Sequence, residues 1–140
     1  MSRLLCATLA LALTTAACGG SDPIIPPPTA PSLPVTDVFP ATPPGTLTPN
    51  GAVTHSFQAA AAGTVQASIT ALSDSAAVVG FALGTFNGTG CQLIIANDTA
   101  KQGTLITGAA SSSGPLCVRI SDATGKLAGP IEYTLSVTHP

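Results

Sequence analysis

Apolar and polar side chains alternate strictly near the end of the chain. Single polar residues separate Ile131, Tyr133, Leu135 and Val137. Successive side chains of a β-strand point to opposite faces, so this period of two predicts a strand with one buried face. Residues 116–122 are predicted to form the preceding strand.

Five further stretches carry a strand signal and are separated by turn residues such as Asn50-Gly51 and Asn87-Gly88. They are residues 53–58, 65–71, 78–86, 91–96 and 104–109. Alternation predicts Ala71 on the buried face, and Asn97-Asp98 is predicted to be a turn. Residues 78–86 are mostly apolar and include Gly80 and Gly84, which predicts a central strand covered on both faces. Seven or eight short strands of this kind predict an all-β fold, an antiparallel β-sandwich.

Charged residues make up only 7% of the chain, and the net charge is −2. Four Lys and Arg side chains cannot form a phosphate-binding patch, which argues against a nucleic-acid partner. The chain has no Trp and one Tyr, so the stacking surface of a carbohydrate site is missing as well.

Proline dominates the region before the predicted strands. Residues 23–49 contain ten of the thirteen prolines. Each proline fixes its own φ and disfavours helix in the residue before it, which predicts an extended, disordered Pro-rich linker. An edge strand over residues 35–39 is the alternative.

The first residues have the three parts of an export signal. Arg3 supplies the positive charge, residues 4–13 are apolar and uncharged, and Thr15-Ala16-Ala17 supplies small residues. Cys18 follows at once, and the arrangement resembles a bacterial lipoprotein leader. The resemblance implies cleavage after Ala17 and acyl chains on Cys18, which would attach the protein to a membrane. Ordinary secretion with a free Cys18 thiol is the alternative.

The expected organisation is therefore a signal peptide over residues 1–17, a lipidated Cys18 with a Pro-rich linker over residues 18–49, and a β-sandwich domain over residues 50–140. The expected location is the bacterial cell envelope. Gly19 stands where resembling systems place an inner-membrane retention Asp, which favours the outer membrane or cell surface.

Two cysteines remain in the predicted domain, Cys91 and Cys117. An even pair in an exported domain predicts a disulfide. Alternation places Cys117 away from Leu116, Val118 and Ile120, whereas Cys91 shares a face with Leu93 and Ile95. Either a β-bulge shifts one phase, or the bridge joins neighbouring strands at an edge. No CxxC motif or third ligand points to a metal site.

From residue 52 onward the sequence resembles the bacterial pre-peptidase C-terminal domain family. The resemblance lies in Ser56-Phe57, in residues 63–69, in residues 114–122 and in residues 133–137. It implies a jelly-roll-like β-sandwich that serves as an accessory or binding module and not as a catalyst. Calcium binds some relatives, but their acidic turn is reduced here to Asp74.

No catalytic residues are predicted. His55 alternates with apolar residues and is expected to be a packed or edge side chain, and His139 lies next to the last residue, where chains fray. Three of the carboxylates (Asp74, Asp98 and Asp122) fall in predicted turns, where Asp commonly bonds backbone amides. No cofactor is expected.

The sequence therefore predicts a non-catalytic envelope lipoprotein whose sandwich binds or spaces something at the surface, with the membrane and a protein of the envelope as its partners. An accessory subunit of a separately encoded secreted hydrolase is the first alternative. A small enzyme is the last.

Overall fold

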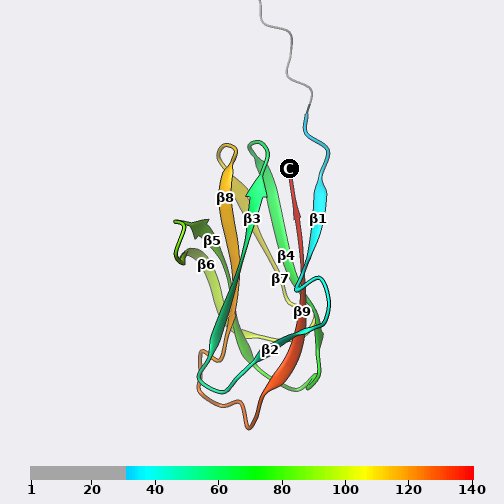
Figure 1. The fold of residues 1–140 in the computed structure, drawn as a ribbon, viewed down its shortest axis with the longest axis vertical. Coiled ribbons are helices and arrows are strands. Elements are labelled where there is room, and N and C mark those ends of the chain that lie inside the picture. Colours follow the sequence, from blue (N-terminus) through cyan, green and yellow to red (C-terminus); the bar gives the residue numbers. More distant parts are fainter. Residues whose placement is uncertain (1–30) are drawn as a thin grey trace, which may run out of the picture. The chain divides into compact units, whose positions relative to one another are not determined.

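The computed structural model describes residues 31–140. They form two antiparallel sheets (Figure 1), and no helix among them is long and apolar enough to cross a bilayer. The strands are β1 (Val35–Phe39), β2 (Gly45–Leu47), β3 (Ala52–Ala59), β4 (Gly63–Leu72), β5 (Val79–Phe86), β6 (Cys91–Ala100), β7 (Leu105–Ala110), β8 (Gly114–Ser121) and β9 (Ile131–His139). The predicted all-β sandwich is confirmed.

The sheets have the orders β1-β9-β4-β7 and β3-β8-β5-β6. β2 also pairs with β9, so β1 and β2 follow one another along the same edge of that strand. β1 pairs with the end of β9, and Val35 lies opposite His139. The described chain therefore enters the fold beside its last residues.

The core between the sheets is built from small aliphatic side chains and a few aromatic ones. The predicted inward residues of β9 are all buried, and the aliphatic residues of β4 are buried as far as Ile69. A β-bulge between Ile69 and Ala71 then shifts the phase. As a result Ala71 is exposed and Leu72 is buried, so the predicted inward position of Ala71 is wrong.

The predicted linker is too long at its C-terminal end. Residues 35–39 and 45–47 pair with β9, and Leu47 is fully buried. The edge strand over residues 35–39, the alternative to an extended linker, is confirmed. The folded unit therefore begins before residue 50, because β9 has an open edge that extended segments between prolines can pair with.

The predicted hairpin at Asn87-Gly88 is present. The Asn87 side chain accepts hydrogen bonds from the Thr89 and Gly90 amides, and Gly88 has a φ of 95°. The predicted turn at Asn97-Asp98 is wrong, since β6 continues to Ala100. Asn97 instead accepts the Thr99 amide hydrogen bond beside an irregularity in the β5–β6 ladder, which lies between Val79 and Phe81 of β5.

Candidate functional site

The two predicted modification sites differ in what the structure describes. Cys18 lies outside residues 31–140. Cys91 and Cys117 form a disulfide with a Cα–Cα distance of 5.7 Å. The bridge fixes the start of the edge strand β6 to β8, although β5 lies between them in the sheet.

Gly84 of β5 makes this bridge possible. It lies opposite Cys117, and a Cβ at Gly84 would collide with the carbonyl oxygen of Gln92. The backbone of β6 therefore passes close over β5 where β5 has no side chain. The ladder shifts between Leu83 and Gly84, so a β-bulge resolves the phase conflict between the two cysteines.

A second feature is a row of rings along the opposite side of the sandwich, where β1 and β9 of one sheet meet β3 of the other. His55 of β3 stacks on Phe39 of β1 with ring centroids 5.3 Å apart. Its Nε2 lies 2.9 Å from the hydroxyl of Tyr133, to which it is hydrogen-bonded. Burial lowers the pKa of His55 and raises the pKa of Tyr133, which favours the neutral form of both.

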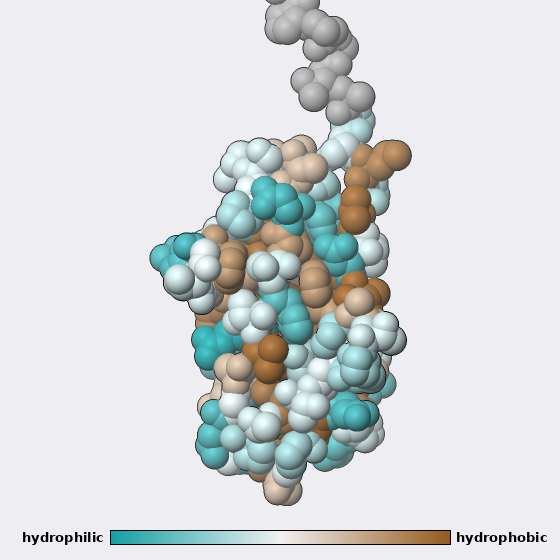
Figure 2. Space-filling view, in the orientation of Figure 1, coloured by the Kyte–Doolittle hydropathy of each residue, from teal (hydrophilic) through white to brown (hydrophobic). Residues whose placement is uncertain are grey.

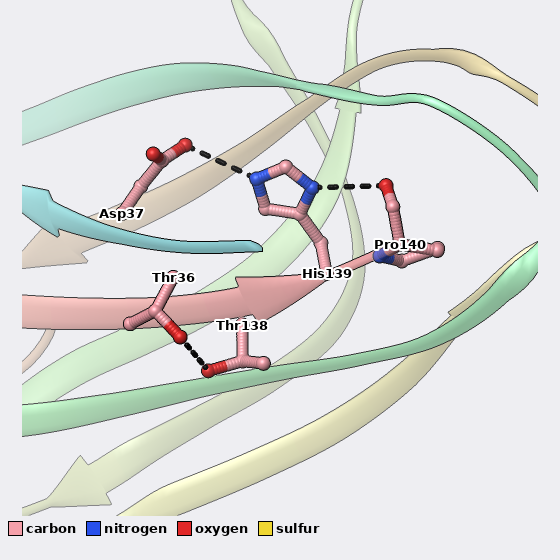
Figure 3. Close-up of polar contacts among 5 residues, drawn as sticks. All are labelled: Thr36, Asp37, Thr138, His139 and Pro140. Carbon is pink, nitrogen blue, oxygen red and sulfur yellow. Dashed lines mark hydrogen bonds and ion pairs between the residues drawn. The ribbon is translucent and has the colours of Figure 1, made fainter. Parts of the chain in front are cut away.

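His139 occupies the end of this row and is only 5% exposed. Its Nε2 lies 3.1 Å from Oδ2 of Asp37, and its Nδ1 lies 3.2 Å from the Pro140 carbonyl oxygen (Figure 3). Phe57 packs against the ring from β3, with centroids 5.0 Å apart. The expectation that this residue lies in a frayed end is wrong, because β1 covers it.

The His139–Asp37 pair has two of the three parts of a Ser-His-Asp triad. In such a triad the second ring nitrogen of the histidine faces the serine hydroxyl. Here that nitrogen faces the Pro140 carbonyl oxygen, and the recorded partner of His55 is Tyr133. In the described part of the chain both rings link neighbouring strands, and neither is hydrogen-bonded to a serine or cysteine side chain.

Two shallow clefts lie at opposite ends of the sandwich. The larger, of about 490 Å³, lies between the β4–β5 and β8–β9 loops. Two of its polar side chains take part in loop structure: Asp74 accepts the Ala76 amide hydrogen bond, and Ser73 Oγ accepts that of Glu132. The smaller, of about 310 Å³, lies beside the β7–β8 loop.

The carboxylate of Asp122 also has a structural role. It accepts hydrogen bonds from the backbone amides of Asn50, Lys126 and Leu127. These bonds lower the pKa of the Asp122 carboxyl, and the bond from Asn50 has the largest effect. Within residues 31–140 no group of three His, Cys, Asp or Glu side chains is arranged to hold a metal ion.

In comparison with known proteins, no family model matches the chain, and no curated protein shows significant similarity to it.

Asp37 is the residue of this row that sequence reasoning missed. It lies in a short run, Val35-Thr36-Asp37-Val38-Phe39, inside the proline-rich region. Its partner is 102 residues away along the chain. Only the pairing of β1 with β9 brings the two together, and no local pattern encodes it.

Proposed function

We propose that the protein is a non-catalytic lipoprotein of the bacterial cell envelope, which holds a disulfide-bonded β-sandwich at the membrane surface as a binding or spacer module. The observation that carries the proposal is the leader: Arg3, the apolar residues 4–13, the small residues 15–17 and then Cys18. Lipid on Cys18 attaches the chain, because stable anchoring requires about two acyl chains and a diacylated Cys supplies them.

A disulfide and a proline-rich segment support this proposal. Disulfides persist in oxidising compartments outside the cytosol, and Cys91 and Cys117 are bridged. Residues 19–34, which precede β1, are rich in proline. At about 3.1 Å per residue, an extended segment of this length reaches roughly 50 Å. A sandwich on such a segment stands clear of the lipid headgroups.

The mass of the mature N-terminal peptide tests the anchor. The expected result is a chain that begins at Cys18 and carries an acyl mass, recovered with membranes. Cys18→Ser is expected to abolish both, whereas Cys6→Ser, which changes a cysteine within the leader, leaves both intact. A mature chain with an unmodified Cys18 thiol, released from the membrane, would contradict the proposal.

An accessory subunit of a separately encoded secreted hydrolase is the second candidate. It is favoured by the edge strand β6, where Leu93 is 46% and Ile94 is 71% exposed. Unpaired backbone and exposed apolar side chains suit a protein partner. Purification from detergent-solubilised envelope distinguishes the candidates, since this one requires a hydrolase in stoichiometric amount that is lost with Ile94→Thr.

A further inference from the structure

The proline-rich residues 19–34, called the leash below, directly precede β1. β1 is therefore the strand that joins the leash to the sandwich. Much of it is exposed: Val35 is 49% and Val38 is 47% exposed. Figure 2 shows hydrophobic surface beside the point where the described chain begins. The partly buried side chains of β1 are Asp37 and Phe39. Besides the backbone ladder and a Thr36–Thr138 hydrogen bond, these two side chains hold the strand in place.

Each of the two hydrogen bonds of His139 requires a proton on the ring nitrogen that makes it. Both of its partners are acceptors, the Asp37 carboxylate at Nε2 and the Pro140 carbonyl oxygen at Nδ1 (Figure 3). A neutral imidazole has one N–H, whereas the imidazolium has two. Both bonds form together only when the ring carries both protons. With one proton, a ring nitrogen lone pair faces an acceptor at a site that is 5% exposed.

The contacts of His139 join three parts of the fold. The Pro140 oxygen also accepts a hydrogen bond of 2.8 Å from the Ala60 amide, in the turn between β3 and β4. Phe57 of β3 faces the ring, and an aromatic face favours a cation. The imidazolium therefore links β1, β9 and the β3–β4 turn.

Two acceptor oxygens face the ring. Asp37 supplies the only ion pair recorded within residues 31–140, and the oxygen at Nδ1 belongs to Pro140, the last described residue. From β3 the ring meets Phe57, which does not titrate. His55, the other titratable side chain in the row, contacts Phe39, where it can affect β1 separately. Tyr133, on β9 itself, is bonded to His55.

We propose that Asp37 and His139 form a pH-sensitive clasp that holds the leash strand β1 on the sandwich. The clasp is complete when His139 is an imidazolium and Asp37 a carboxylate. It weakens when His139 loses a proton at higher pH, because one of its two bonds then has no donor. It weakens again when the Asp37 carboxylate gains a proton in acid, because the ion pair is then lost.

The consequence for the tethered protein depends on the proposed lipid anchor. Opening the clasp frees residues 35–44, as far as the start of β2. These residues would add roughly 30 Å to the leash at about 3.1 Å per residue. Opening the clasp would also expose the edge of β9 that β1 covers.

Amide hydrogen exchange of the full chain in detergent tests the clasp directly. Protection of the β1 amides, corrected for intrinsic exchange rates, is expected to fall about tenfold between pH 5.5 and 8, as for one lost hydrogen bond to a charged group. Asp37→Asn is expected to remove this dependence and to leave the fold intact, since Asp37 is 40% exposed. Nitrogen NMR over the same pH range is expected to show that protection of β1 falls together with the loss of one of the two ring protons of His139.

Two variants control the experiment. Thr36→Val removes a β1 hydrogen bond that does not titrate, so protection is expected to fall equally at both pH values. His55→Gln is expected to keep the pH dependence. Protection of β1 that is independent of pH in the unmodified chain, or a dependence that survives in Asp37→Asn, would overturn the clasp. The measurement does not depend on acylation of Cys18, so failure of the anchor proposal is seen separately by mass.

Discussion

The edge strands on the two sides of the sandwich are held in place by different interactions. On one side, a disulfide holds the edge strand β6, and Gly108 of β7 packs against Leu83 and Ile95. On the other side, rings and a histidine–carboxylate pair hold the edge strand β1. The first closure is covalent. The second consists of contacts that each break at small cost.

The two edge strands therefore have different roles: the disulfide at β6 stabilises the fold, whereas β1 connects the fold to the leash. Edge strands expose unpaired backbone and are the first to open. The disulfide keeps β6 from opening, so the core stays covered there. β1, which receives the leash, can leave without disturbing any covalent bond. The two histidines extend the contrast, because burial lowers the pKa of His55, whereas both partners of His139 are hydrogen-bond acceptors.

The largest effect is expected from removing the covalent closure. Replacing both Cys91 and Cys117 by Ala should lower the free energy of unfolding by roughly 3.5 kcal/mol, from the chain entropy of a loop of this length. Urea unfolding of the oxidised protein and the double variant measures it. A loss below about 1 kcal/mol would mean that the bridge contributes little and that the two sides are alike.

Gly84→Ala tests the close passage of β6 over β5. A Cβ at this position meets the Gln92 backbone, so a loss of about 2–3 kcal/mol is expected. Gly114→Ala is the matched control, since nothing lies within 4 Å of its added Cβ. Equal effects of the two substitutions would argue against the crossing at Gly84.

Tyr133→Phe removes the hydrogen bond to His55, which lies on the side of the sandwich that β1 covers. The expected loss is about 1 kcal/mol, typical of one hydrogen bond. A double-mutant cycle with His55→Phe isolates the pair, because the second substitution should then cost less than it does alone. Strict additivity would show that the bond contributes nothing.

The smallest effect is expected from His55 alone. Its pKa is lowered in the folded protein by burial, so the unfolded chain binds more protons as the pH falls below about 6.5. Its contribution to stability is therefore present above that pH and is lost as the pH falls through the lowered pKa. His55→Gln should flatten this part of the stability profile, measured by thermal unfolding. An unchanged profile would assign the dependence to another group.

Much of the fold could be predicted from the sequence, because alternation is a local signal. From residue 52 onward the seven strands correspond to the seven predicted stretches. Errors arose where a β-bulge changed the phase, as between Ile69 and Ala71. No residue type marks such a bulge reliably, since it depends on the neighbouring strand.

The candidate site was predicted only in part. The Cys91–Cys117 bridge follows from parity and compartment, whereas its path over Gly84 depends on strand order. The sequence offers β1 only as an alternative, because the prolines around it favour an extended linker. The Asp37–His139 pair could not be predicted, since strand pairing across the whole length of the domain creates it.

Hydrogen exchange of the full chain at pH 5.5, before and after reduction of the disulfide, compares the two closures most directly. The account predicts that reduction lowers protection of β6 and leaves β1 unchanged, since β1 opens locally and independently. If β1 and β6 lose protection together, or if β1 is unprotected from the start, the two sides are not closed separately and the account is wrong.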